Sequence, residues 1–165
     1  MLKKEGERSV SPSERTERRT EVHTKRGHLY KGLFYQIDGP DGCGKSTQTE
    51  MLMHYVEREK YEVVKIRDPG GTSIGDMIRK ILLETDNVEM SPRVEFLLFE
   101  ASRAQLVDEK IKPALEQGKI VLADRFDSST TAYQGAAGKV PMDIILYGNR
   151  VATDGIFPDR SIFLD

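Results

Sequence analysis

The sequence predicts an α/β fold in which a parallel β-sheet is covered by helices on both faces. The first observation behind this prediction is that short apolar stretches alternate with longer helical ones from Leu33 onward, an order typical of parallel sheets with helical crossovers. The second is that three expected strands end in unusual polar sequences, beginning at Asp38, Arg67 and Asp124. Because ligands bind such sheets at the carboxyl ends of the strands, we expect a site where these three ends meet.

Length and composition indicate one domain of an ordinary cytoplasmic protein. The 165 residues include 38% hydrophobic and 32% charged residues and carry a net charge of −2, which indicates no nucleic-acid partner. No apolar run is long enough to cross a bilayer, so we expect no membrane partner. The single cysteine, Cys43, excludes an internal disulfide framework and fits a reducing compartment.

Residues 1–31 differ in composition from the rest of the chain. They hold nine Lys/Arg and five Glu with few apolar residues, too few to offset the entropy of ordering. We expect a disordered, solvated extension, and a basic tail that contacts nucleic acid or acidic partners is the alternative. His23 and His28 lie in this stretch without neighbouring ligand residues, and we assign them no function. The folded domain is expected over residues 32–165.

The first half of this domain is expected to contain two strands and two helices. The first strand covers residues 33–38 and is followed by a glycine-rich turn and a helix that ends near Glu59. Residues 62–67 form the second strand, which stops at the Asp-Pro-Gly-Gly sequence that follows it. A short amphipathic helix then covers residues 74–83.

The second half begins with a long helix. Ser91 suits its N-cap and Pro92 its first position. Pro113 should kink or restart this helix, and Gly118 suits its C-terminus. A third strand is expected at residues 119–124, helices at 128–134 and 142–153, and a fourth strand at 161–164.

A phosphate-binding loop is the most specific motif of the sequence. Residues 39–46 satisfy the pattern G-x-x-x-x-G-K-[ST] and lie between an expected strand and an expected helix, the context that the motif requires. Backbone N–H groups and the helix N-terminus would surround the phosphates, with Lys45 at the β- and γ-phosphates and the Ser46 hydroxyl on Mg²⁺. This motif predicts a P-loop NTPase fold. The residues expected to bind the nucleotide are Gly39, Pro40, Asp41, Gly42, Cys43, Gly44, Lys45, Ser46 and Thr47.

Cys43 has two interpretations within this loop. The helix N-terminus and a nearby lysine would lower a thiol pKa, which is compatible with a reactive thiolate. We favour the other interpretation, that Cys43 is a small residue at a variable loop position.

The pair Asp124-Arg125 indicates a kinase among the proteins that carry this loop. The N-K-x-D element with which a GTPase reads its base does not occur in the sequence. Asp124 can organise the waters of Mg²⁺, and Arg125 can hold a second phosphate bidentately. The alternative is an ion pair at a strand end. We expect Lys45, Arg125, Asp124 and Asp41 to carry the catalytic roles.

The long helix has a second apolar face. Phe99 and Arg103 are spaced i, i+4 and therefore share a face, about 200° from a predicted core stripe that includes Leu97. Phe99 could stack on a base while Arg103 hydrogen-bonds it, or the face could pack against another helix. Helix geometry alone leaves both open. The predicted core stripe consists of Leu97, Ala101, Ala104, Val107 and Ile111.

Four further segments resemble the thymidylate kinase family. DRFDSSTTAYQG, from Asp124, is similar to the family's D-R-x-x-x-S-x-x-A-Y-Q-G, and RDPGGT, from Arg67, is similar to R-E-P-G-G-T. LLFEASRAQLV, from Leu97, and FPDRSIFLD, which ends at Asp165, resemble L-L-F-x-A-x-R-x-Q and P-D-L-T-L-Y-L-D. Together with the phosphate loop, these matches are spread in order over residues 34–165, and their combination is highly specific.

This resemblance implies roles for individual residues. Phe99 would stack on thymine and Arg103 would hydrogen-bond its edge. Tyr133 would favour deoxyribose, and Asp41 would organise metal or sugar. The resemblance departs at Asp38, which is shorter than the family's glutamate. The remaining expected acceptor-binding residues are Pro69 and Thr130 at the base and Arg67 and Arg125 at the phosphate.

The implied reaction is ATP + dTMP → ADP + dTDP with Mg²⁺, and the resemblance also implies a homodimer. The resemblance stops on the family's fourth strand, so we expect the fold to lack the last strand and the lid. We therefore expect turnover by this chain alone to be weak or absent. Two alternatives remain. One is a P-loop kinase for another small acceptor, and the other is a module that binds nucleotides without turnover.

Overall fold

The computed structural model describes residues 28–84, 89–136 and 140–165. The expected disordered extension lies almost entirely outside these residues. Of the residues assigned to it, His28 is buried, and its Nε2 lies 3.3 Å from the Asp159 Oδ2 atom. Asp159 Oδ2 also accepts a hydrogen bond from the Phe34 amide. Packed residues therefore extend to His28, on the N-terminal side of residue 32.

Four parallel strands form the sheet, in the order β2-β3-β1-β4. The α/β fold with a parallel sheet is thus confirmed. β3 lies between β1 and β2, with Asp124 opposite both Ile37 and Arg67. This register brings the three polar strand ends side by side. The strands are β1 (Leu33–Asp38), β2 (Val63–Arg67), β3 (Ile120–Asp124) and β4 (Arg160–Phe163).

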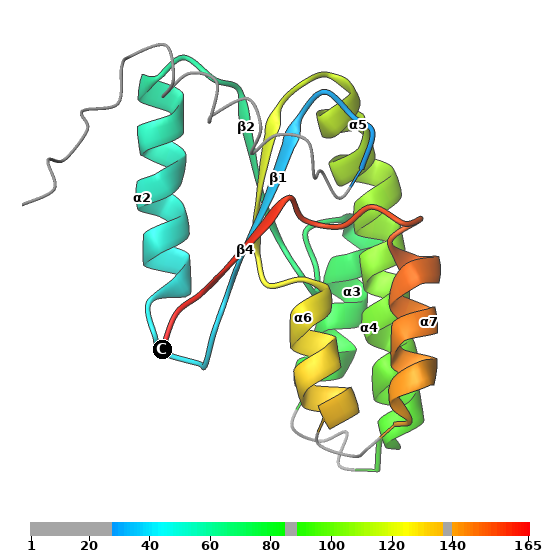
Figure 1. The fold of residues 1–165 in the computed structure, drawn as a ribbon. Coiled ribbons are helices and arrows are strands. Elements are labelled where there is room, and N and C mark those ends of the chain that lie inside the picture. The colour runs from blue at the N-terminus through cyan, green and yellow to red at the C-terminus, as the bar shows by residue number, and fades with distance from the viewer. Residues whose placement is uncertain (1–27, 85–88, 137–139) are drawn as a thin grey trace, which may run out of the picture.

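Helices lie on both sides of this sheet (Figure 1). α2 (Lys45–Arg58) lies alone on one side, and the remaining labelled helices lie on the other. The inner helices and the sheet enclose the main apolar core, which includes Phe34, Leu106, Val121 and Phe126. The other helices are α3 (Ser73–Leu83), α4 (Pro92–Leu106), α5 (Lys112–Glu116), α6 (Asp127–Thr130) and α7 (Met142–Ala152).

Capping side chains fix the starts of α3 and α4. Thr72 Oγ1 accepts a hydrogen bond from the Gly75 amide at 2.9 Å, and Ser91 Oγ accepts one from the Val94 amide at 3.4 Å. Pro92 occupies the first turn of α4, where its missing N–H costs nothing. The predicted start of the long helix is confirmed.

The predicted irregularity at Pro113 takes the form of a wide turn. A π-helical segment, Val107–Ile111, joins α4 to α5. A second one, Thr131–Ala136, continues α6 where a single helix over residues 128–134 was expected. Pro113 supplies no N–H, which favours irregular hydrogen bonding in the preceding turn.

The predicted core stripe of α4 is wrong in its N-terminal half. Leu97 is 56% exposed and Ala101 is exposed, whereas Glu100 and Arg103 are buried. The buried face also includes Phe96 and Leu106. An apolar periodicity missed this face because α4 turns charged residues inward, where they bond to one another.

Candidate active site

The loop between β1 and α2 has the backbone that the phosphate-binding motif requires. Gly44, at the N-cap of α2, has a φ of 92°, in the left-handed region that favours glycine. A Cβ atom at Gly39 would lie 2.3 Å from the Leu164 carbonyl oxygen. The chain therefore passes close to β4 here, and only glycine fits.

Lys45 reaches back along this loop. It is buried, and its Nζ donates to the carbonyl oxygens of Gly39 at 3.0 Å and Pro40 at 2.6 Å. The ammonium group lies at the floor of a pocket of about 420 Å³. The walls of this pocket come from the loop and from the ends of β2 and β3. Its lining residues include Asp41, Gly42, Gly44, Ser46, Thr47, Arg67, Asp68, Arg79, Asp124 and Arg125.

Arg125 lies in the same pocket as Lys45. Its Nη2 donates to Asp41 Oδ1 at 2.6 Å, and its Nη1 donates to Asp38 Oδ1 at 3.1 Å. The guanidinium carbon is 5.6 Å from the centre of the Tyr133 ring. The two cationic groups predicted for two phosphates thus line one cavity.

Ser46 and Asp124, the residues predicted to hold Mg²⁺, are also brought together. Ser46 Oγ donates to Asp124 Oδ2 at 2.7 Å. One hydroxyl and one carboxylate beside a phosphate pocket fit Mg²⁺, which keeps several waters and takes further oxygens from phosphates. Among the described residues, no three His, Cys, Asp or Glu side chains form a metal-binding cluster, so a site built wholly from such ligands is not seen there.

Arg103 lies deeper, below the pocket, and is 1% exposed. A guanidinium has five N–H donors, and five protein acceptors surround this one. In this structure the Arg103 guanidinium donates its hydrogen bonds to protein acceptors. Its role in recognising the base stays a prediction. These partners are Asp68 Oδ2 at 2.7 Å, Glu100 Oε1 at 2.8 Å, Asn149 Oδ1 at 2.6 Å, Thr130 Oγ1 at 2.6 Å and the Phe126 carbonyl at 3.4 Å.

Burial dominates the electrostatics around Arg103. It raises the pKa of Asp68 and of Glu100, and the nearby Arg103 charge only partly offsets this effect. The pKa of Asp127 is raised for the same reason. The network therefore contains more carboxylates than one buried cation can neutralise.

The other predicted acceptor-binding residues lie around this network. Thr130 is buried and bonded to Arg103, while Tyr133 is 49% exposed. Phe99 is half-buried on α4. Pro69 follows a cis peptide bond, and Arg67 lines the phosphate pocket.

Sequence reasoning missed several residues of this region, among them Asp68, which lines the pocket and accepts a hydrogen bond from Arg103. Arg79, on α3, lines the phosphate pocket and donates through Nη1 to the Pro69 carbonyl at 2.9 Å. Its position on a helix that begins just after a polar strand end could have indicated it. Glu100 and Asn149 accept hydrogen bonds from Arg103. The sequence signal for them was weaker, because each is only a polar residue on the inner face of its helix.

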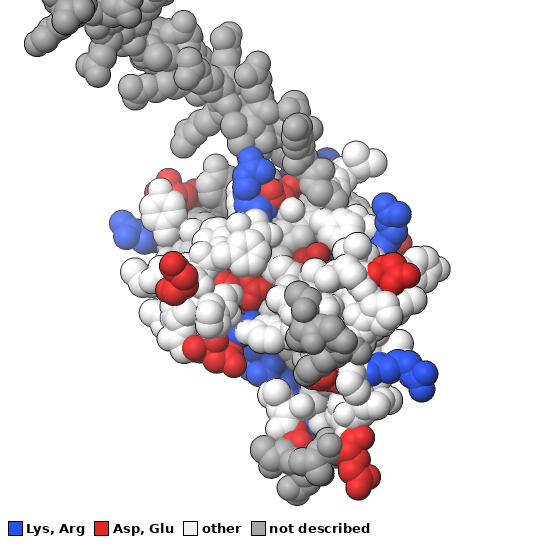
Figure 2. Space-filling view, turned by 60° about the horizontal axis from the view of Figure 1, so that its bottom comes forward, with Lys and Arg blue, Asp and Glu red and all other residues white. Residues whose placement is uncertain are grey.

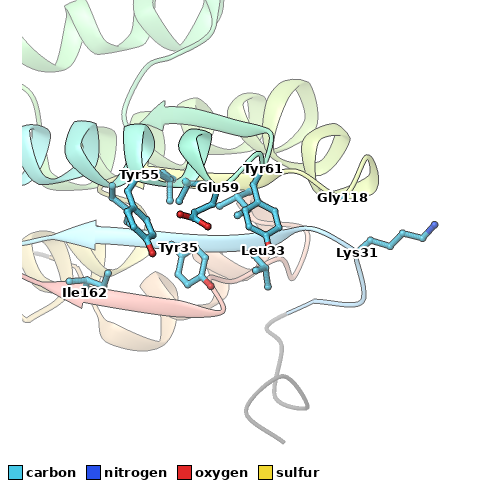
Figure 3. Close-up of a pocket in the computed structure, with 12 residues that line it drawn as sticks. Lys31, Leu33, Tyr35, Tyr55, Glu59, Tyr61, Gly118 and Ile162 are labelled. Carbon is cyan, nitrogen blue, oxygen red and sulfur yellow. The ribbon is translucent and has the colours of Figure 1, made fainter. Parts of the chain in front are cut away.

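A second pocket, of about 690 Å³, lies between α2 and the sheet (Figure 3). Its lining is mainly aromatic and aliphatic, with Tyr35, Tyr55 and Tyr61 among the lining side chains, and it also includes Lys31 and Glu59. None of the residues predicted for phosphate or acceptor binding lines it. The candidate site is therefore the smaller, charged pocket.

Comparison with known proteins decides the family. The family model described as thymidylate kinase matches residues 37–165. The chain belongs to the thymidylate kinase family. The resemblance read from the motifs is thereby confirmed.

Relatives in this family are similar over the whole domain. A thymidylate kinase from Exiguobacterium sp. is 47% identical over 134 residues, which is 81% of this chain and 63% of the relative. One from Halothermothrix orenii is 49% identical over 135 residues, 82% of this chain and 65% of the relative. The crystal structure of thymidylate kinase from Ehrlichia chaffeensis superimposes with a TM-score of 0.75 at 36% identity, covering 81% of this chain and 75% of that one. The chain thus spans less than two thirds of the length of these curated relatives.

Proposed function

We propose that the pocket between the phosphate loop and Arg125 transfers the γ-phosphoryl group of ATP to dTMP, giving ADP and dTDP in the cytoplasm. The observation that carries the proposal is that Lys45 and Arg125 line the same cavity at the ends of adjacent parallel strands. Two cationic groups on one cavity suit a phosphoryl group that passes between two phosphorylated molecules. Residues 32–165 would form the kinase domain.

The loop side of the pocket would hold the donor. Backbone N–H groups of residues 39–47 would bind the ATP phosphates, and Lys45 would exchange its carbonyl partners for phosphate oxygens. Ser46 and Asp124 would hold Mg²⁺, the latter through water. The metal would neutralise charge on the transferred group. Asp41, at the loop edge, would act between donor and acceptor.

The opposite side would hold the acceptor. Arg125, with Arg67 and Arg79 nearby, would bind the dTMP phosphate. An oxygen of that phosphate would attack the γ-phosphorus as the bond to the β-phosphate oxygen breaks, and the electron pair would leave with ADP. The attacking oxygen is already anionic, so no general base is needed. Phe99, Pro69, Thr130, Tyr133 and Arg103 would form the thymine and deoxyribose site.

The test is dTDP formation from ATP and dTMP, with dCMP and UMP as competing acceptors. We expect weak turnover in which dTDP is the preferred product, and we expect an Arg125→Ala variant to lose it. Preference for another acceptor would indicate a different P-loop kinase. Binding of ATP and dTMP without product would instead indicate a nucleotide-binding module.

The chain also has a surface suited to a homodimer. α3, α4 and α7 lie side by side (Figure 1) and carry exposed apolar residues at helical spacing. Charged residues of both signs alternate on the face that Figure 2 shows, without one extended basic area in its described part. No helix in the described ranges has the length and hydrophobicity of a membrane span. The exposed apolar residues of the surface proposed for the homodimer are Ile74, Met77 and Ile81 on α3, Val94 and Leu97 on α4, and Ile144, Tyr147 and Val151 on α7.

A further inference from the structure

Asp38 ends β1 directly before the phosphate loop and is 4% exposed. Its carboxylate is the acceptor for five different donor groups. They belong to β1, to the phosphate loop and to the segment after β3, so one side chain joins the three parts that form the pocket. The donors are Gln36 Nε2 at 3.2 Å, the Gly39 amide at 2.8 Å, Ser128 Oγ at 2.5 Å, Ser129 Oγ at 2.8 Å and Arg125 Nη1 at 3.1 Å.

Arg125 is the donor with a function in the pocket, and its backbone is unusual. It has a φ of 68°, a conformation that few residues other than glycine adopt and that surrounding contacts must hold. Its amide donates to the Ile37 carbonyl at 3.0 Å. The guanidinium direction then depends on its hydrogen bonds to Asp38, Ser129 and Asp41 and on the Tyr133 ring beside it.

Asp38 and Asp41 differ in how firmly they can hold Arg125. The Asp41 side chain is 97% exposed, so water and salt screen its pair with Arg125. The Asp38 side chain is 6% exposed, and four other donors fix its orientation. Asp38 is therefore the rigid partner and Asp41 the exchangeable one.

We propose that Asp38 is a positioning residue that aims the Arg125 guanidinium at the phosphate of the acceptor nucleotide. The identity of that acceptor as dTMP rests on the proposed function. Asp38 binds Nη1 and leaves Nη2 to the exchangeable partner Asp41, so the planar guanidinium keeps its orientation while Nη2 exchanges Asp41 for a phosphate oxygen.

A negative charge beside Arg125 could act in the opposite sense, by competing with the phosphate for the guanidinium. Four neutral donors also hydrogen-bond the Asp38 carboxylate and stabilise its charge, which weakens this competition. When the Asp38 charge is removed, the dTMP affinity lost because Arg125 is no longer oriented should therefore exceed the affinity gained because no carboxylate competes with the phosphate. The two effects predict opposite changes in dTMP affinity.

The experiment is isothermal titration of dTMP and of thymidine, which lacks the phosphate, into four chains: wild type, Asp38→Asn, Arg125→Ala and the double variant. We expect Asp38→Asn to weaken dTMP binding by roughly tenfold, the value of one well-oriented charge-assisted hydrogen bond. Thymidine affinity should not change. In the Arg125→Ala background, Asp38→Asn should have no further effect on dTMP, because its action passes through Arg125.

Two further variants separate positioning from folding. Asp38→Glu keeps the carboxylate within reach of Arg125 and should recover most of the dTMP affinity. Asp159→Asn removes another buried carboxylate, at the start of β4, and should lower thermal stability without changing the ratio of dTMP to thymidine affinity. An equal loss for thymidine, the same loss in the Arg125→Ala background, or tighter dTMP binding would each overturn the proposal.

A direct readout covers the case in which the wild type binds no dTMP, an outcome that would remove the proposed acceptor. Side-chain ¹⁵N–¹H spectra of arginine-labelled chain report whether the Arg125 guanidinium is held. We expect resolved Nη signals in the wild type that average in Asp38→Asn and return in Asp38→Glu. Averaged Nη signals in the wild type, or unchanged ones in Asp38→Asn, would show that Asp38 does not position Arg125.

Discussion

At the scale of single residues, the network around Arg103 combines one buried cation with several buried carboxylates. Glu100 Oε1 accepts from Arg103, whereas its Oε2 has no hydrogen-bond partner among the described residues. A Glu100→Gln substitution keeps one acceptor and removes the charge that burial penalises. Because Asp68 still pairs with Arg103 and burial penalises the Glu100 carboxylate, we expect the free energy of unfolding at pH 8 to rise by about 1 kcal/mol.

The pH dependence of unfolding checks this explanation. Burial raises the folded-state pKa of Glu100, so the folded chain binds more protons than the unfolded chain above the ordinary carboxyl pKa of about 4.3. Stability therefore falls as pH rises from that value through the raised pKa. Urea unfolding across pH 4.5–8 should show that the free energy of unfolding falls less with rising pH for Glu100→Gln than for the wild type. Parallel curves for the two chains would contradict the assignment, since Asp68 and Asp127 remain in both.

Lys45 provides the corresponding prediction for the donor side. Its ammonium group is the buried cation of the phosphate loop, so Lys45→Ala should weaken ATP binding by at least about tenfold, the loss expected for a charge-assisted phosphate contact. Titration of ATP would measure it. The control is Lys112→Ala, which removes an exposed lysine that pairs with Asp154 far from the loop. Equal losses in both variants would show a general charge effect.

The sequence predicted some of these residues and missed others for a physical reason. The loop around Lys45 and the Asp124-Arg125 pair belong to short contiguous motifs, whose spacing alone specifies their chemistry. The partners of Arg103 come from separate elements, and Asn149 lies 46 positions along the chain. Such a contact depends on helix packing, which local sequence does not determine.

At the scale of elements, the contact between α4 and α7 depends on one glycine. A Cβ atom at Gly148 would lie 2.4 Å from the Phe96 Cζ atom, and Phe96 is buried beside Ile145. Gly148→Ala should therefore lower the free energy of unfolding by about 1–3 kcal/mol through overpacking, despite the better helix propensity of alanine. Val151→Ala, at an exposed position of the same helix, is the matched control. A neutral or stabilising Gly148→Ala in urea unfolding would show that the ring moves aside freely.

Element boundaries followed local signals where such signals exist. The starts of α3 and α4 coincide with Thr72 and Ser91, whose side chains cap them. Pro113 signalled the first π-helical segment, Val107–Ile111, whereas the second, Thr131–Ala136, had no comparable local signal. The buried face of α4 was mispredicted because apolar periodicity cannot recognise a face built around Arg103.

At the scale of the whole molecule, the parallel sheet followed from the alternation of strands and helices, but the sequence did not show which helical surfaces remain open. Leu97 is the clearest case, since it was predicted in the core and is 56% exposed. Val94 on α4 and Met77 on α3, a helix in contact with α4, are exposed as well. An apolar surface that spans neighbouring helices is typical of an interface between subunits.

This surface predicts the oligomeric state. In the proposed homodimer Leu97 would lie against the partner subunit, so Leu97→Glu would bury a carboxylate at the interface. Sedimentation velocity over a concentration series should show a dimer for the wild type and a monomer for Leu97→Glu. The matched control is Tyr55→Glu on α2, also an exposed apolar residue but on the other side of the sheet, which should leave the dimer intact. A monomeric wild type would refute the homodimer, and a dimer lost only in Tyr55→Glu would move the interface to α2.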